Sequence, residues 1–286
     1  MAGNADVLIR TMTMADVPAG LRLCRAARWN QTERDWRHFL TAAPDGALVA
    51  EEGGNVIGTA ATLPYGAFTW ISMVLVDPAA RGKGVGTTLL HRGLELIPDG
   101  VSPRLDATPA GEVLYRKLGF AGEYGLERWF LDTRSPRIAL PGPTARQLQP
   151  GDWPAIQEMD FRAFGASRAG LLRRLAAEAP EYARVVDDGP GLRGYLFGRH
   201  GHVRDHLGPM VADGQETARA LLDSCLAPLP ARAVFMDVPD DQQAFRGFLI
   251  AAGFAVERPF LRMHRGILSA PGQPSLVYGI AGPEFG

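Results

Sequence analysis

The feature that most constrains the fold is that the 286-residue chain repeats its own layout once. The segment TMTMADVPAGLRLC carries Asp16 two residues before a proline, and QLQPGDWPAIQEM carries Asp152 in the same relation to a proline. Likewise, LYRKLGF at 114–120 is echoed by FLIAAGF at 248–254. The two offsets, 136 and 134 residues, are nearly equal. They predict a duplicated unit of about 135 residues, which is the size of an ordinary domain.

The duplication predicts two domains, residues 1–134 and 135–286, joined around 133–145. The joining segment DTRSPRIALPGPTAR is rich in proline and turn-forming residues, as linkers are. In each unit, stretches with helical periodicity alternate with apolar stretches typical of strands, and FTWISMVLVDP indicates a strand buried on both faces. This order predicts a mixed α/β fold in which a central sheet carries helices on both sides.

Composition narrows the function classes. Hydrophobic residues make up 46% of the chain and the formal net charge is -1, so the chain can bury a core and has no long-range attraction to nucleic acid or an anionic membrane. Cys24 and Cys225 are too isolated for a metal site or a disulfide framework. No stretch has the length of a membrane span, and the N-terminus lacks an apolar signal region. We therefore expect a cytoplasmic protein with no metal and no nucleic-acid or membrane partner; a homodimer stays open.

The stretch VLVDPAARGKGVGTTLLHRGL, residues 74–94, places a glycine-rich turn between a strand and a helix. The three glycines of RGKGVG, residues 81–86, allow the backbone to approach a ligand closely. The N–H groups of the first helical turn have no intrahelical partner, and with the helix dipole they form an anion site suited to a diphosphate. The arginine and lysine of the motif add positive charge beside that site.

Two familiar phosphate-binding loops do not fit this turn. The dinucleotide pattern G-x-G-x-x-G requires a different spacing from the G-x-G-x-G found here. A P-loop requires Ser or Thr after its lysine, whereas Lys83 is followed by Gly84. The alternative interpretation is a flexible turn without a ligand.

The glycine-rich turn and the segments around it resemble those of the GCN5-related N-acetyltransferases (GNAT). V-x-P-x-x-R-G-x-G-x-G before an apolar helix is similar to the family's cofactor motif, and LDATPAGEVLYRKLGF at 105–120 resembles its later strand and short helix. The likeness is to tandem proteins whose second unit is a degenerate copy. It implies two acyl-CoA N-acyltransferase-like domains, of which the first transfers acetyl directly from acetyl-CoA to a primary amine. The alternative from another class is a non-catalytic acyl-CoA sensor or interaction protein.

The resemblance also implies roles for individual residues. Tyr115 matches the tyrosine that protonates the departing thiolate of coenzyme A; its alternative is a core aromatic. Thr108 stands where the family usually has an asparagine, so its cofactor contact departs from the pattern. The cofactor-binding residues implied are Met73, Val74, Leu75 and Val76 for the pantetheine arm, Arg81, Gly82, Lys83, Gly84, Val85, Gly86 and Thr87 for the diphosphate, and Thr108.

The acceptor side and the base are less defined. The central strand carries no carboxylate, so the candidates for a base are Glu33, Asp35 and Asp106, although each taken alone is more readily interpreted as a solvated surface charge. The segment RWNQTERDW is rich in aromatic and amide groups and predicts an acceptor pocket, with helix packing and capping as the alternative. The substrate-binding candidates are Trp29, Asn30, Gln31, Trp36, Tyr65, Trp70 and Ser72.

The second unit lacks the chemistry of the first. HLGPMVADGQETARALL has no Arg-Gly-x-Gly-x-Gly loop, and Leu249, opposite Tyr115, cannot donate a proton. We expect a fold copy that completes the acceptor pocket at the domain interface. His200, His202 and His206 match no metal-ligand spacing; an acceptor-facing cluster is the alternative.

Overall fold

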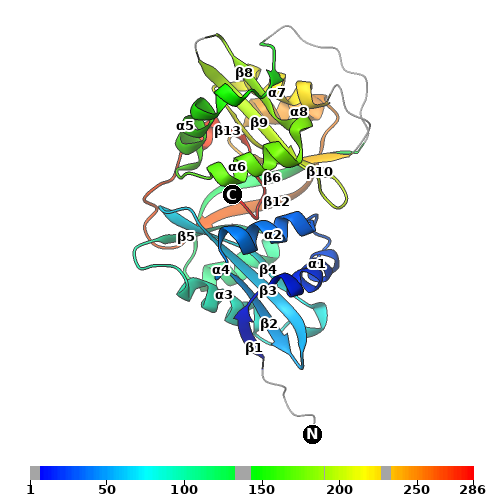
Figure 1. The fold of residues 1–286 in the computed structure, drawn as a ribbon, viewed down its shortest axis with the longest axis vertical. Coiled ribbons are helices and arrows are strands. Elements are labelled where there is room, and N and C mark those ends of the chain that lie inside the picture. The colour runs from blue at the N-terminus through cyan, green and yellow to red at the C-terminus, as the bar shows by residue number, and fades with distance from the viewer. Residues whose placement is uncertain (1–6, 133–142, 190, 227–232) are drawn as a thin grey trace.

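The computed structural model describes residues 7–132, 143–189, 191–226 and 233–286. In these ranges it confirms the predicted mixed α/β architecture, with two similar units whose strands form one continuous sheet (Figure 1). The predicted linker lies largely at 133–142, outside the described residues.

The first unit contains, in chain order, β1 (Leu8–Thr11), η1 (Met14–Asp16), α1 (Val17–Ala26), α2 (Glu33–Ala42), β2 (Ala47–Glu52), β3 (Asn55–Pro64), β4 (Phe68–Val76), η2 (Pro78–Ala80), α3 (Val85–Glu95), β5 (Ser102–Ala107), α4 (Pro109–Lys117) and β6 (Ala121–Leu131). The second contains β7 (Arg146–Gln147), η3 (Pro150–Asp152), α5 (Trp153–Phe164), α6 (Ala169–Glu178), η4 (Pro180–Tyr182), β8 (Arg184–Asp187), β9 (Leu192–Arg199), β10 (Asp205–Ala212), α7 (Gln215–Leu226), β11 (Val234–Pro239), α8 (Gln243–Ala251), β12 (Ala255–His264), η5 (Pro274–Leu276) and β13 (Val277–Gly279).

The sheet separates two layers of helices because alternate strand residues point to opposite faces. Ala47 and Val49 of β2 belong to the apolar cluster that includes α1 and α2, whereas Leu48 and Ala50 pack with α3. Helix α2 begins at Glu33, and Thr32 and Asp35 form a reciprocal capping box at its start.

The duplication is visible in an ion pair at the entry of each unit. Arg10 donates two hydrogen bonds to Asp16, and Arg146 donates two to Asp152, all at 2.8 Å. Each arginine lies 136 positions from its counterpart, and each carboxylate also accepts the N–H that precedes its short helix. The two units therefore begin with the same local structure.

The closing strands of the two units are exchanged, which the sequence reading did not predict. The sheet order is β1-β2-β3-β4-β5-β12-β6-β11-β10-β9-β8-β7. Thus β12 of the second unit pairs with β5 of the first, and β6 of the first pairs with β11 of the second. The expected boundary at residue 134 divides the chain, but it does not divide the sheet.

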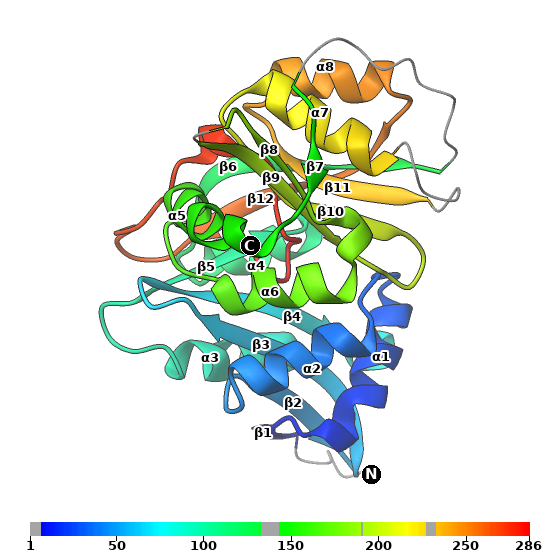
Figure 2. The same ribbon diagram turned by 45° about the horizontal axis from the view of Figure 1, so that its top comes forward.

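The segment after β12 runs back between the two units. Strand β13 pairs with β10, and residues 280–286 then lie between the halves, where both views place the C label (Figures 1 and 2). The Trp70 indole donates to the Pro283 carbonyl, the Tyr65 hydroxyl donates to the Phe285 carbonyl, and the Phe285 ring stacks on Phe39 at 5.3 Å. This segment joins the apolar core that both units share.

Candidate active site

The first unit opens between β4 and β5. These parallel strands pair only from Phe68 to Trp70, opposite residues 102–104. Beyond that point β4 continues to Val76 beside β3, while β5 turns to β12 as its partner. Among the described residues, no strand then pairs with the β5-facing edge of β4. That edge has free main-chain groups for an extended ligand to meet.

A bulge in β4 accompanies this opening. Met73 has a φ of 55°, and the register between β3 and β4 shifts beside it. Such a conformation is costly for a residue other than glycine, so the surroundings must hold it. The Thr59 hydroxyl donates to the Met73 carbonyl at 2.8 Å and satisfies a main-chain acceptor at the distorted position. A bulge of this kind bends its strand locally, here beside the gap to β5.

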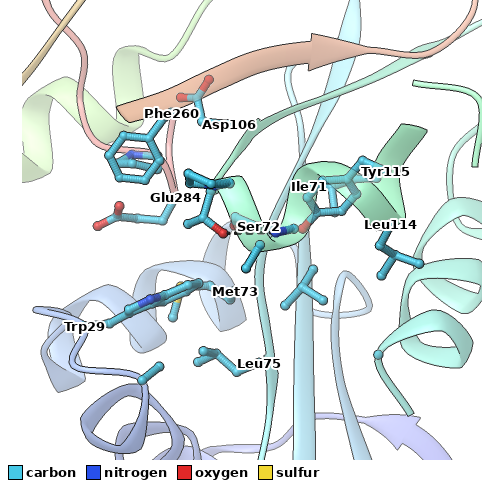
Figure 3. A pocket seen from close by; sticks show the side chains of 18 of the residues that line it. Trp29, Ile71, Ser72, Met73, Leu75, Asp106, Leu114, Tyr115, Phe260 and Glu284 are labelled. Carbon is cyan, nitrogen blue, oxygen red and sulfur yellow. Dashed lines mark hydrogen bonds between the residues drawn. The ribbon is translucent and has the colours of Figure 1, made fainter. Parts of the chain in front are cut away.

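A cavity of about 670 Å³ occupies the gap. Figure 3 shows Leu114 and Tyr115 on one side of it, Trp29, Glu284 and Phe260 on the other, and side chains of β4 between them. The sequence-predicted residues that line the cavity are Trp29, Asn30, Gln31, Ser72, Met73, Val74, Leu75, Val76, Arg81, Gly86, Thr108 and Tyr115.

The glycine-rich turn lies next to this cavity, although only Arg81 and Gly86 of residues 81–87 line it. Gly82 and Gly84 have φ values of 78° and 83°, a region that glycine adopts readily. The N–H groups of residues 82–87 have no acceptor among the described residues. Gly86 packs closely against β4, since a Cβ there would lie 3.3 Å from the Val76 side chain at the end of that strand. The turn therefore presents bare amides at the start of α3, beside the opening.

The remaining residues of the turn have distinct surroundings. Val85 is buried and packs with Leu89 beneath the sheet, so only its main chain is available to a ligand. Gly82, Lys83 and Gly84 are exposed, and Thr87 is partly buried.

Tyr115 lies on α4, with its ring edge-on to Phe120 at 5.8 Å. Burial raises the pKa of the Tyr115 hydroxyl to about 12, so it stays protonated at neutral pH and is able to donate a proton. The Thr108 hydroxyl accepts the N–H of Gly111 at 3.2 Å and caps α4. Thr108 thus acts on the helix that carries Tyr115, as well as lining the cavity.

The structure brings only part of the expected acceptor wall to the cavity. Trp36, Tyr65 and Trp70 do not line it, because all three are packed in the shared core. Tyr65 and Trp70 instead anchor the 280–286 segment through the hydrogen bonds described above. Asn30 lines the cavity, and its amide also holds the 203–204 main chain with three hydrogen bonds.

Of the three carboxylates that the sequence suggested as a base, one lines the cavity and two do not. Glu33 is exposed and pairs with Arg37, and Asp35 is buried in an ion pair with Arg199 at 3.2 Å; neither lines the cavity. Asp106 does line it, and both of its oxygens accept from Arg262 at 2.8 Å. Burial nevertheless raises the pKa of Asp106.

Sequence reasoning missed Glu284. It lines the cavity, is 3% exposed, and accepts a hydrogen bond from Arg199 through Oε1. Nothing in the local sequence PEFG signals a site, because its position depends on the return of the chain between the two units. Three further lining residues missed in the same way are Arg128, Arg258 and Phe260, which lie on the exchanged strands.

Both units of the chain match models of one protein family. Residues 43–121 match a family model described as an acetyltransferase (GNAT) domain, and residues 156–279 match a second model of the same description. The chain belongs to the GNAT family. It is a tandem member, and with its family it is an acyltransferase of the N-acetyltransferase type.

Relatives over nearly the whole chain agree. The chain is 24% identical over 263 residues to the holothin acyltransferase of Pseudoalteromonas sp. (strain SANK 73390), covering 91% of this chain and 88% of the relative. It is 23% identical over 268 residues to the uncharacterized N-acetyltransferase YitH of Bacillus subtilis (strain 168), covering 93% and 94%. A putative acetyltransferase structure from Pyrococcus horikoshii superposes with a TM-score of 0.82 at 25% identity, covering 98% and 96%. A tandem GNAT protein from the clavulanic acid biosynthesis pathway shares the fold, with a TM-score of 0.64 at 17% identity and coverage of 91% and 98%.

The second GNAT unit lacks the features of the first. Leu249, the counterpart of Tyr115, is fully buried in its core. Strand β10 pairs with β11 only at Asp205 and His206, so the strands separate as β4 and β5 do. Here, however, β13 pairs with β10 at Met210 and Val211, and the N–H of Ile280 donates to the main chain of β11. The chain's own segment thus fills the place that corresponds to the cavity of the first unit.

The histidines of HGHVRDH do not converge. His206 is buried 3.4 Å from Asp237, His200 lies 3.1 Å from Glu181, and His202 is exposed. None of the three lines the cavity. Across the described ranges, no group of three or more His, Cys, Asp or Glu side chains has the arrangement of a metal site. No helix in those ranges has the length and apolar character needed to span a membrane.

Proposed function

We propose that this GNAT protein transfers the acetyl group of acetyl-CoA to a primary amine in the cavity between β4 and β5. The observation that supports the proposal best is the meeting of three features at one opening. These are the unpaired edge of β4, the bare amides of residues 82–87, and the protonated hydroxyl of Tyr115. The first suits the pantetheine arm, the second a diphosphate, and the third a departing thiolate.

The chemistry follows from this placement. The amine nitrogen attacks the thioester carbonyl carbon, the carbon–sulfur bond breaks, and the thiolate takes the proton of Tyr115. The proton lost by the amine goes to Glu284. Asp106 is the weaker candidate because Arg262 donates to both of its oxygens. In Glu284, by contrast, only Oε1 has a hydrogen-bond partner among the described residues. Holding the amine beside the thioester accounts for much of the acceleration.

The test is coenzyme A release from acetyl-CoA with a panel of primary amines, for wild type and Tyr115→Phe. Phenylalanine keeps the ring that packs on Phe120 and removes the proton, so turnover should fall about 10- to 1,000-fold while acetyl-CoA affinity stays. Tyr278→Phe removes a buried hydroxyl on β13, outside the cavity, and should leave turnover unchanged. Unchanged turnover in Tyr115→Phe would remove the acid role. Binding of acetyl-CoA with no release for any amine would favour a non-catalytic acyl-CoA sensor.

A further inference from the structure

Within the part of the chain that the structure describes, Arg258 is a charge without an ionic partner at the acceptor end of the cavity. It lies on β12 directly across from Arg128 of β6, and both line the cavity. Arg128 gives two hydrogen bonds to Asp237, at 2.7 and 2.8 Å. Arg258 has no hydrogen bond or ion pair among the described residues; its Nε is buried, and its guanidinium lies 5.0 Å from the centroid of the Phe260 ring. Like charges facing each other across strands are unfavourable, so this arrangement costs stability.

The other charges at this end of the cavity are matched. Asp106 is paired with Arg262, Glu284 with Arg199, and Arg128 with Asp237. Arg81 belongs to the opposite end, where its Nε donates to the Val76 carbonyl next to the glycine-rich turn. Burial and the neighbouring Arg128 lower the pKa of Arg258, the direction expected for a cation that lacks an anion. A bound anion would restore the balance.

Two more polar atoms at the cavity are buried and have no hydrogen-bond partner in the described ranges. They are Oε1 of Gln31 and Oγ of Ser72, both on residues that line the cavity. Buried polar atoms in native proteins nearly always have a hydrogen-bond partner, so unpaired ones at a cavity indicate a ligand. An amide oxygen and a hydroxyl are both able to accept hydrogen bonds from an amine.

We propose that the acceptor is an amino acid or a similar amine that carries a carboxylate, with the carboxylate bound by Arg258 and the amine held by Gln31 and Ser72. This inference rests on the proposed transfer reaction and names the class of its substrate. An arginine fork binds a carboxylate through two parallel hydrogen bonds, which gives orientation as well as affinity. Trp29 and Phe260 form an apolar part of the cavity wall, against which the rest of the acceptor would pack.

The test compares the twenty amino acids with their carboxamides in the coenzyme A release assay. An amino acid and its carboxamide differ in the negative charge that Arg258 would bind. The amine of the carboxamide is less basic, so more of it is unprotonated at neutral pH, and amine basicity alone would favour the carboxamide. Wild type should prefer the best amino acid over its carboxamide about 10- to 100-fold in kcat/KM, the value of a charge-assisted hydrogen bond. Arg258→Gln should abolish that preference, mainly by raising KM for the amino acid, and should leave acetyl-CoA affinity unchanged.

Two further readouts separate this inference from the transfer reaction itself. Calorimetry of the coenzyme A-bound protein with the same amino acids should show binding that Arg258→Gln weakens, whether or not acetyl is transferred. Because Arg258 is unpaired, Arg258→Gln should also leave Tm unchanged or raise it, which a structural role would not do. Arg246→Gln, which breaks a partly buried pair with Glu127 outside the cavity, is the matched control and should keep the preference. Equal use of acids and carboxamides by wild type, or a preference that survives Arg258→Gln, would overturn the proposal.

Discussion

Replacing Arg199 tests whether a buried ion-pair cluster holds the two units together. Arg199 is 2% exposed and lies between Asp35 of the first unit, at 3.2 Å, and Glu284 of the returning segment. Arg199→Met would leave two buried carboxylates, and among the described residues Asp35 would keep an ion pair only with Arg174, at 3.8 Å. Breaking a buried pair by removing one partner costs about 3–5 kcal/mol, because the other charge is left uncompensated.

In a chain of this size, each kcal/mol lowers Tm by about 2 °C, so Arg199→Met should lower Tm by about 6–10 °C. Thermal unfolding followed by circular dichroism at pH 7 measures the shift. The loss should shrink near pH 5, because an unpaired buried carboxylate has a raised pKa and is relieved by protonation. The matched control is Arg193→Met, which removes a solvent-exposed pair with Asp213 and should leave Tm nearly unchanged. A shift in Arg199→Met no larger than in Arg193→Met would refute the reasoning.

Three further outcomes are expected. Gly84→Gln should lower the free energy of unfolding by about 1–2 kcal/mol from its positive φ alone, since an added Cβ meets no atom within 4 Å. Gly84→Glu should in addition weaken acetyl-CoA binding at least tenfold relative to Gly84→Gln in calorimetry. Equal affinities of the two variants would contradict an anion site. Because burial raises the pKa of Tyr115 to about 12, kcat at saturating amine should not fall between pH 8 and 10. A fall in kcat over this range that disappears in Tyr115→Phe would contradict the role of Tyr115 as the acid. Burial lowers the pKa of His38 from 6.5 to about 4, so the contribution of the neutral imidazole to stability is complete above pH 6.5 and is lost as pH falls toward 4. His38→Gln should therefore flatten the decline of Tm over that pH range. An unchanged decline would contradict this role of His38.

Local patterns predicted the elements of both units well. Apolar periodicity and the glycine-rich turn predicted the strand β4 and the helix α3 that follows it, and the paired Asp-x-Pro starts predicted the duplication. The glycine-rich turn and Tyr115 were found because their residues are close together in the chain. These features depend on neighbours within one unit, which a single sequence displays directly.

The remaining features depend on contacts between distant segments. The exchange of β6 and β12 leaves each strand with the same apolar pattern that it would have in its own unit, so no periodicity reveals it. Glu284 and Arg258 reach the cavity only through this exchange and the returning segment. Trp36 and Trp70 show the opposite failure, because large aromatic residues with polar atoms suit a pocket wall and a buried core equally well.

The central claim is that one acyl-CoA binds per chain, in the gap between β4 and β5, while β13 fills the corresponding gap between β10 and β11. Titration calorimetry with acetyl-CoA on the full chain tests it most directly. A stoichiometry of one is the predicted result. No heat of binding, or two sites per chain, would contradict it.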